Sequence, residues 1–132
     1  MTAINTLLLI NADPSQGIAC HAYRYAKAFL ESGYQSDKLN IFFYGEAAHT
    51  ANILRWQTAD RTNLTQLWSQ LSLAYQLNLP VCVSTALTRG VTDNDNAGRH
   101  QLDSSNLASG FKLVGLGELA EQLSKADKVI SF

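Results

Sequence analysis

Short aliphatic runs alternate with helix-patterned segments along this chain, and this alternation constrains its possible folds most. The runs lie at residues 4–10, 38–44, 79–83, 111–114 and 128–132. Runs of this length are typical of strands that are covered on both faces. Between them, apolar residues recur at helical spacing, as along residues 18–30 and 63–78. This alternation predicts an α/β fold with a mainly parallel five-stranded sheet and helices on both faces, a three-layer α/β/α arrangement.

Further helices are expected between the other runs. Residues 45–54 and 115–123 have helical patterns, and Thr62 or Asn63 is a plausible cap for the helix over residues 63–78. The last helix is expected to turn four apolar side chains inward: Leu116, Leu119, Ala120 and Leu123.

Two polar stretches are expected to be loops. Residues 92–98 are polar, and residues 55–61 are polar apart from Trp56. An exposed Trp56 would suit an interface anchor, whereas a tryptophan packed back onto the core is the equally good alternative.

Length and charge bound the class of protein. The chain has 132 residues, and we expect residues 1–132 to form one domain. Its net charge of −1 argues against direct, charge-driven binding to nucleic acid or to an acidic membrane surface. The first ten residues lack the basic region of a signal peptide, and no apolar run approaches the roughly 20 residues of a membrane span.

The chain has two cysteines, Cys20 and Cys82. Two widely spaced cysteines form neither a disulfide framework nor a zinc site. A reducing compartment is therefore the natural setting, and we expect a cytoplasmic protein.

Cys82 stands where a strand pattern changes into a helix pattern. Residues 79–83 suit a buried strand, after which Ser84 or Thr85 can cap a short helix. Gly90 can close that helix in the left-handed conformation. Cys82 should therefore lie at the carboxyl end of a strand, the edge of a parallel sheet where reactive groups collect.

A cysteine in this position has two interpretations. A free thiol has a pKa of about 8.5, and a helix N-terminus lowers it, which favours the nucleophilic thiolate. That thiolate could attack a disulfide or persulfide sulfur. Alternatively, Cys82 is a small buried apolar residue, which is the commoner fate of a free cysteine. Arg89 could add positive charge near Cys82 and stabilise an anion, or could be a solvated residue at the end of the helix.

Other motifs give no cofactor or metal site. Gly115 and Gly117 are only a fragment of a dinucleotide fingerprint, and the loop after the first strand lacks the glycines and lysine of a P-loop. The three histidines have no ligand spacing: His21, His49 and His100. Residues 93–98 resemble the start of a calcium loop, but Ser104 stands where its bidentate glutamate is needed.

Several segments together resemble one known family. They are Asn40–Gly45 with Ala51-Asn52, Val81–Val91, Ala97–Arg99, Ser104–Leu107, Gly110-Phe111, Gly115–Gly117, Leu119-Ala120 and Asp127–Val129. On these segments the chain resembles the DsrE family of small sulfur-handling proteins, and most of all its TusD-like branch. The resemblance covers nearly the whole length, and the cysteine between strand and helix is its most diagnostic part.

The resemblance implies a function that the residues alone do not give. TusD-like proteins are sulfurtransferase subunits of a relay, in which the position matching Cys82 accepts persulfide sulfur from an upstream carrier. A downstream acceptor protein then delivers it for 2-thiolation of the tRNA wobble uridine. The family fold is a doubly wound α/β domain. The implied partners are sister TusB-like and TusC-like subunits in a heterohexamer, with no cofactor.

Two alternatives stay open at this point. DsrE relatives also move sulfur in sulfur oxidation, and a scaffold subunit without catalysis is the second alternative. A thiol at position 82 favours the transfer role, because a scaffold has no need of it. Cys20 matches no cysteine of the family pattern, and a bystander role is favoured over a resolving thiol.

Overall fold

Five parallel strands form one sheet in the computed structural model, which describes residues 4–35 and 38–132. The strand order is β4-β3-β2-β1-β5, and every pairing is parallel. The strands are β1 (Thr6–Ile10), β2 (Leu39–Phe43), β3 (Leu79–Cys82), β4 (Phe111–Val114) and β5 (Lys128–Ser131). This confirms the predicted five-stranded parallel sheet. Residues 1–3, which begin the N-terminal stretch considered above, lie outside the described residues.

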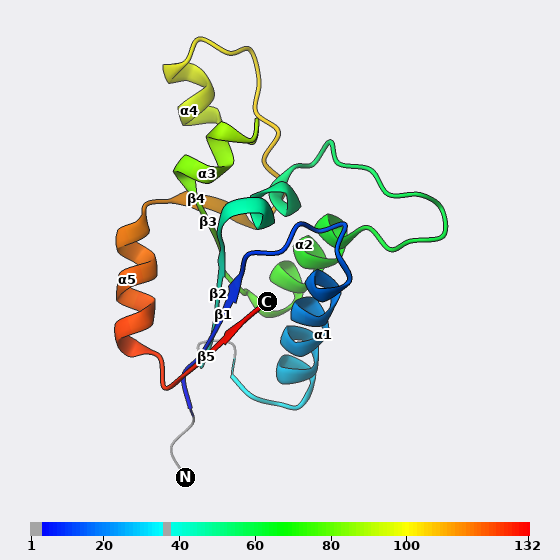
Figure 1. The fold of residues 1–132 in the computed structure, drawn as a ribbon, viewed down its shortest axis with the longest axis vertical. Helices are drawn as coiled ribbons and strands as arrows, with labels where there is room; N and C mark the ends of the chain where they lie inside the picture. Colours follow the sequence, from blue (N-terminus) through cyan, green and yellow to red (C-terminus); the bar gives the residue numbers. More distant parts are fainter. Residues whose placement is uncertain (1–3, 36–37) are drawn as a thin grey trace.

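Helices cover both faces of the sheet, so the predicted three-layer arrangement is also confirmed. They are α1 (Gly17–Glu31), the 3₁₀ helix η2 (Gly45–Ala51), α2 (Leu64–Tyr75), α3 (Val83–Thr88), α4 (Asn94–Arg99) and α5 (Leu116–Lys125). Figure 1 shows α1 and α2 on one side of the sheet and α5 alone on the other. Among the described residues, no helix has the length and hydropathy needed to cross a membrane.

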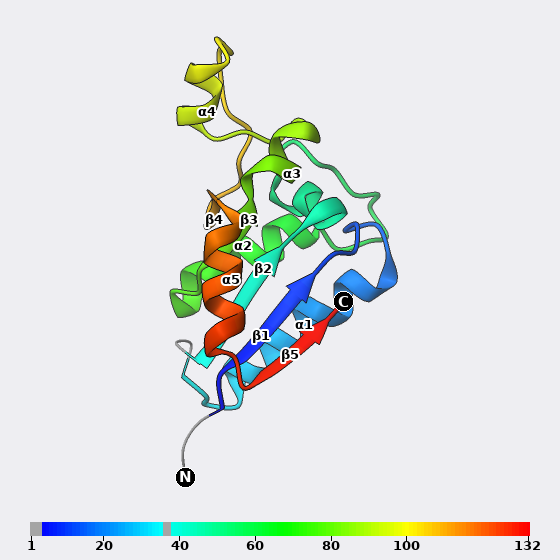
Figure 2. The same cartoon turned by 60° about the vertical axis from the view of Figure 1, so that its left-hand side comes forward.

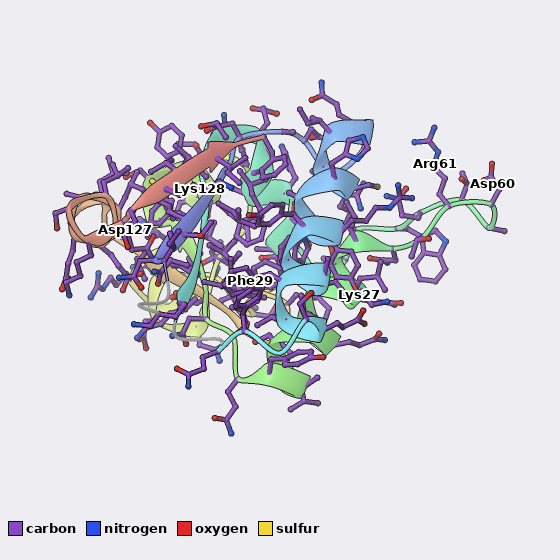
Figure 3. All side chains as sticks on the ribbon, turned by 90° about the horizontal axis from the view of Figure 1, so that it is seen from below. Lys27, Phe29, Asp60, Arg61, Asp127 and Lys128 are labelled. Carbon is purple, nitrogen blue, oxygen red and sulfur yellow. The ribbon has the colours of Figure 1, made fainter. Side chains whose placement is uncertain are left out.

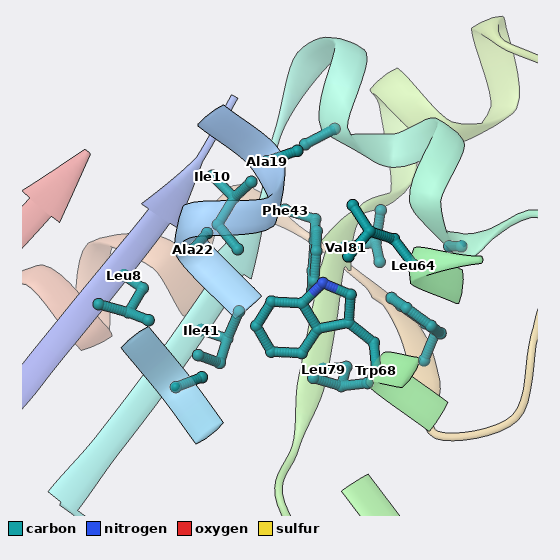
Figure 4. Close-up of a cluster of buried hydrophobic side chains, with 14 of the residues drawn as sticks. Leu8, Ile10, Ala19, Ala22, Ile41, Phe43, Leu64, Trp68, Leu79 and Val81 are labelled. Atoms are coloured by element: carbon teal, nitrogen blue, oxygen red, sulfur yellow. The ribbon is translucent and has the colours of Figure 1, made fainter. Parts of the chain in front are cut away.

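Strand alternation divides the buried side chains between the two faces. Leu8 and Ile10 pack under α1 and α2 in the larger core, whereas Leu7 lies on the α5 side. Trp68 of α2 lies at the centre of the larger core (Figure 4) and is only 1% exposed. Its ring meets those of Tyr23 and Phe43 edge-on, each at 5.4 Å between centroids. This geometry stabilises aromatic pairs beyond the area they bury.

Local signals set several helix ends as expected. Asn63 caps α2, and its side chain accepts a hydrogen bond from the backbone N–H of Gln66 at 3.2 Å. Gly90 has φ +78° directly after the short helix α3, the left-handed conformation expected of a closing glycine.

Residues 92–98 are not the polar loop that their composition predicts. Asp93 caps the short helix α4, because its carboxylate accepts a hydrogen bond from the backbone N–H of Asn96 at 2.8 Å. The aspartate that suggests a calcium loop therefore serves as a helix cap. The predicted helix over residues 45–54 is also shorter, since η2 ends at Ala51.

The inward orientation predicted for α5 is wrong for most of its residues. Leu116 is 50% exposed, Leu123 is 44% exposed and Ala120 is exposed as well. Only Leu119 of the four packs against the buried residues of the α5 side. The helix has the predicted apolar stripe, but within residues 4–35 and 38–132 no second helix lies beside it to cover that stripe.

The loop at residues 55–61 is exposed, as predicted. Trp56 is 82% exposed, which settles the two alternatives for this residue in favour of exposure. Figure 3 shows Asp60 and Arg61 at the far end of this loop, well away from the helices. Arg61 ties the loop back to the turn after β1, because its guanidinium donates a hydrogen bond to the Ser15 carbonyl at 3.4 Å.

The two tryptophans provide a matched test of this core. We expect Trp68→Ala to lower the free energy of unfolding by about 3–5 kcal/mol, because it leaves a cavity under the sheet. Trp56→Ala should change it by no more than about 0.5 kcal/mol, since that ring is exposed. Urea denaturation followed by circular dichroism measures both values. Equal losses in the two variants would contradict this description of the core.

Candidate functional site

Cys82 is the last residue of β3 and the cap residue of α3, where the sequence predicted it. Its Cα pairs with that of Val114 on β4. The helix starts two or three residues earlier than expected, because Cys82 and not Ser84 or Thr85 occupies the cap position. The Thr85 hydroxyl instead donates a hydrogen bond to the carbonyl oxygen of Cys82 at 3.2 Å, which joins the strand end to the first turn.

The side chain of Cys82 lies on the α5 side of the sheet and is buried. It forms a small cluster with Leu7 and Phe42, and the residue is 1% exposed. Four partly buried side chains pack against this cluster: Leu9, Val114, Leu119 and Ala126. The thiol is therefore closed off from solvent in this conformation of the chain.

The cover over this cluster is thin. Helix α5 contains no buried residue, and it is the helix that lies over this face. By contrast, α1 and α2 together contribute nine buried residues to the opposite layer, four from α1 and five from α2. Local opening is easiest where few apolar contacts hold an element. The α5 layer is thus the part of the fold that can expose Cys82 most readily.

A groove of about 530 Å³ lies beside this cluster, between α5 and strands β2 to β4. Pro80 lines it, and Val114 both lines the groove and packs against the Cys82 cluster. Charged side chains of both signs form much of its wall: Lys112, Glu118, Glu121 and Lys125. Sequence reasoning missed this groove, because it depends on how far α5 stands from the sheet.

Arg89 lies at the opposite end of α3 from Cys82. Its guanidinium donates two hydrogen bonds to Oε1 of Glu46, from Nη2 at 2.7 Å and from Nε at 2.9 Å. A third goes to the Thr85 carbonyl at 3.1 Å. These contacts fasten α3 to η2 across the carboxyl edge of the sheet. Whether Arg89 also stabilises an anion stays a prediction.

The two cysteines lie on opposite faces of the sheet. Cys20 of α1 is half-buried and packs against the larger core, whereas Cys82 belongs to the cluster under α5. Both are free thiols. A disulfide requires Cα atoms within about 7 Å, so a layer of sheet between the two residues disfavours Cys20 as a resolving partner.

One group of possible metal ligands escaped the sequence analysis. Ligand atoms of Asp13, Glu46 and His49 lie within 4.8 Å of one another at the carboxyl edge of the sheet. Asp13 follows β1, whereas Glu46 and His49 both lie in η2 after β2, so the sequence spacing gave no signal for the group of three. Arg89 already pairs with Glu46, and the charge of Arg55 acts on Asp13, so the local charge is balanced without an ion.

The carboxyl group of Asp13 is also engaged locally. Burial raises its pKa, but hydrogen bonds from the Ser15 hydroxyl and backbone N–H, at 2.6 and 2.8 Å, favour the ionised form. Positive charge from His49 and Arg55 acts in the same direction, and the net result is a pKa below the usual value. We therefore assign this group a role in holding the turn after β1.

The family of this chain is identified by a match that covers nearly its whole length. Residues 5–132 match the model of the DsrE/DsrF-like family. This chain belongs to the DsrE family. The match spans every strand and helix described above, including the β3–α3 junction with Cys82.

Two curated relatives of this chain have the same name. Proteins called Sulfurtransferase TusD from Salmonella typhi and Salmonella dublin are each 39% identical to this chain over 114 residues. Each alignment covers 86% of this chain and 88% of the relative. The TusD-like resemblance inferred from the sequence is thereby confirmed.

Solved structures support the DsrE-type fold. The ychN protein from E. coli superposes with a TM-score of 0.71 at 21% identity, over 98% of this chain and 99% of that one. A conserved protein of unknown function from Bacteroides thetaiotaomicron gives a TM-score of 0.59 at 15% identity, over 97% and 95% of the two chains. At these identities the likeness shows the fold alone.

The link between Arg89 and Glu46 can be measured with a double-mutant cycle. We expect a coupling free energy of about 0.5 kcal/mol, because Glu46 is largely exposed and solvent screens the pair. The cycle combines Arg89→Ala, Glu46→Ala and the double variant, with urea denaturation as the measurement. A coupling of zero would mean that the pair does not hold α3 in place.

The burial of Cys82 predicts an order of thiol reactivity in this DsrE-family chain. Cys20 should react with N-ethylmaleimide at least about tenfold faster than Cys82 in the folded protein, because a buried thiol reacts only after local opening. Peptide mass spectrometry after timed quenching gives both rates. In denaturing urea the two rates should converge. Equal rates in the folded chain would show that the α5 layer does not protect Cys82.

Proposed function

We propose that this chain is a sulfurtransferase subunit that accepts persulfide sulfur on Cys82 and passes it along a relay. The observation that carries the proposal is a cysteine at the β3–α3 junction of a DsrE-family chain that is 39% identical to proteins named Sulfurtransferase TusD. In our proposal, residues 1–132 work as one domain.

The transfer step needs only thiol chemistry. The Cys82 thiolate attacks the outer sulfur of a donor persulfide, a new S–S bond forms on Cys82, and the donor's S–S bond breaks. The donor cysteine leaves as a thiolate, so charge is conserved and no external oxidant or reductant is used. The outer sulfur keeps its proton through the exchange. The onward step repeats this exchange, with Cys82 as the leaving group.

The local structure gives that step some support. The chain after Cys82 turns directly into α3, and unpaired N–H groups at a helix start favour negative charge nearby. Arg89 could add to this only if its guanidinium left Glu46, so we assign it first to holding α3 and keep anion stabilisation as a second, weaker role. The thiol must also become exposed, and we propose that α5 yields to allow this.

We further propose the setting of the relay. The sulfur goes toward 2-thiolation of the tRNA wobble uridine in the cytoplasm, where thiols such as Cys20 and Cys82 stay reduced. An upstream persulfide carrier and a downstream sulfur acceptor protein dock on this chain, and TusB-like and TusC-like sister subunits complete a heterohexamer. Direct binding to the tRNA is not part of the proposal, because the net charge is −1. Sulfur trafficking in sulfur oxidation is the alternative pathway for the same chemistry.

One observation favours a second candidate function. Cys82 is 1% exposed and sits in an apolar cluster, as expected of a packing residue. A non-catalytic scaffold subunit would have the same fold and the same partners, with the transfer chemistry on another chain.

Intact mass spectrometry separates the two candidates. The protein, with its sister subunits, is incubated with a cysteine desulfurase, cysteine and the upstream carrier. We expect a gain of one sulfur atom on the parent chain and on Cys20→Ser, and none on Cys82→Ser. Reduction with dithiothreitol should remove the added sulfur, because a persulfide is reducible.

The contrary outcome is equally clear. A folded parent chain that gains no sulfur with every partner present would exclude transfer through Cys82 and leave the scaffold function. A gain that persists in Cys82→Ser and disappears in Cys20→Ser would move the chemistry to the other cysteine.

A further inference from the structure

Two asparagines that are far apart in the sequence meet at the carboxyl edge of the sheet. Asn52 directly follows η2, and Asn106 lies on the segment that returns from α4 toward β4. The Nδ2 group of Asn106 donates a hydrogen bond to Oδ1 of Asn52 at 3.2 Å. Figure 2 shows α3 and α4 beyond the carboxyl ends of the strands, and this pair ties that region to the rest of the fold. The sulfur-transfer proposal gives neither asparagine a role.

Asn106 is half-buried and uses every polar group that it has. Its Oδ1 accepts a hydrogen bond from the Thr92 N–H at 2.8 Å, and its Nδ2 also donates to the Gly90 carbonyl at 2.8 Å. Its backbone N–H donates to the Thr92 carbonyl at 3.1 Å, and its own carbonyl accepts from the Ile53 N–H at 2.8 Å. We call this set the asparagine junction: Asn52, Gly90, Thr92 and Asn106.

The backbone partners determine how each amide is oriented. The Gly90 carbonyl can only accept and the Thr92 N–H can only donate, so Asn106 presents Nδ2 to the first and Oδ1 to the second. Oδ1 of Asn52 also accepts a hydrogen bond from the Leu54 N–H at 2.9 Å. Asn52 therefore acts in the junction only as an acceptor, whereas Asn106 acts as both donor and acceptor.

The junction holds the end of α3. The last carbonyl groups of a helix have no partner within the helix, and Asn106 supplies one just beyond α3, at Gly90. The ion pair between Arg89 and Glu46 fastens the same end of α3 to η2. Two separate attachments therefore join the far end of this six-residue helix to η2 and the residue that follows it, while its near end begins at Cys82.

This arrangement links Asn106 to the reacting residue. Cys82 is the cap residue of α3, so a rotation of α3 would change the backbone torsion angles between Cys82 and Val83 and the surroundings of the thiol. Such a rotation requires the hydrogen bonds of Asn106 to break. The junction can therefore keep the chain after Cys82 in place while the α5 layer yields on the other side.

We propose that Asn106 is a positioning residue for sulfur transfer, which acts on Cys82 through α3. Attack on a persulfide requires the thiolate and the outer sulfur to be correctly oriented, and small displacements of a reacting group lower the rate strongly. Asn106 does not take part in the exchange of sulfur itself. This inference rests on the proposed sulfur transfer and adds to it a residue that controls its geometry.

Single-turnover sulfur transfer tests the proposal. The chain, with its sister subunits, receives sulfur from the upstream carrier after a cysteine desulfurase has charged it, and intact mass is followed at a series of carrier concentrations. We expect Asn106→Ala to lower the rate at saturating carrier about tenfold or more, because the reacting groups are less well oriented. The carrier concentration that gives half of this rate should stay the same, since Asn106 positions Cys82 and does not bind the carrier.

The conservative change from asparagine to aspartate should act differently at the two positions. Asn106→Asp keeps the oxygen that Thr92 needs but loses both Nδ2 hydrogen bonds, so we expect it to be as slow as Asn106→Ala. Asn52→Asp keeps the acceptor that Asn52 supplies, so it should transfer sulfur at the parent rate, whereas Asn52→Ala should be slower. An effect of added negative charge alone would be the same for both aspartates.

A matched control separates positioning from a general loss of stability. Asn63→Ala removes the cap of α2 in the opposite layer, and the loss of a helix cap destabilises a protein. We expect this variant to transfer sulfur at the parent rate. Hydrogen exchange gives a readout that does not need sulfur. Asn106→Ala should speed the exchange of α3 amides about tenfold and leave α2 unchanged, while Asn63→Ala should do the reverse.

Three results would overturn the proposal. The first is an Asn106→Ala variant that transfers sulfur as fast as the parent. The second is a variant in which only the half-saturating carrier concentration rises, because Asn106 would then belong to a docking surface. The third is an equal loss of rate in Asn63→Ala. A parent chain that gains no sulfur overturns sulfur transfer and this role together, and hydrogen exchange still decides whether Asn106 holds α3.

Discussion

The strictly parallel register of the sheet is the constraint on which the rest of the structure depends. Each strand sends alternate side chains to opposite faces, so a shift of one residue would exchange the two faces. In β3 this places Val81 in the larger core and Cys82 under α5. The pairing of Cys82 with Val114 on β4 fixes that choice. The chemistry proposed for this chain therefore rests on strand register as much as on the cysteine itself.

The two faces also differ in how firmly they are held. Trp68 and Phe43 fill one side with fully buried rings and the partly buried Tyr23 packs against Trp68, whereas α5 rests on the other side without a single buried residue. A buried thiol and a weakly held cover are compatible, because local opening needs only the α5 layer to yield. The carboxyl edge is meanwhile kept rigid by the Arg89–Glu46 pair and by the Thr85 hydrogen bond to Cys82. Different contacts therefore determine how firmly the carboxyl end of β3 is held and how weakly the α5 layer over it is held.

Sequence patterns predicted the layers, the five strands and the place of Cys82, because those follow from hydrophobic period and from capping chemistry. They failed where the outcome depends on tertiary context. The apolar stripe of α5 was found, but a stripe does not show whether a neighbour exists to cover it. Helix α4 was missed because the polar composition of residues 92–98 predicted a loop, although Asp93 is the cap of this helix. Sequence patterns could not predict two further features, because the tertiary arrangement of the strands and helices brings their residues together. These are the group of Asp13, Glu46 and His49 and the groove beside Cys82.

The face of the sheet on which the Cys82 side chain lies also affects how large a group can be accommodated there. A persulfide is larger than a thiol by one heavy atom, and inserting an extra group into a well-packed interior typically costs about 1–3 kcal/mol. Beside Val81, within the densely packed aromatic layer, the larger persulfide side chain would not fit without strain. Under α5 the larger side chain contacts a layer that few buried contacts hold in place. Val114, which packs against the Cys82 cluster, lines a groove of about 530 Å³. The thinly covered face can therefore take up a change in side-chain volume that would strain the densely packed one.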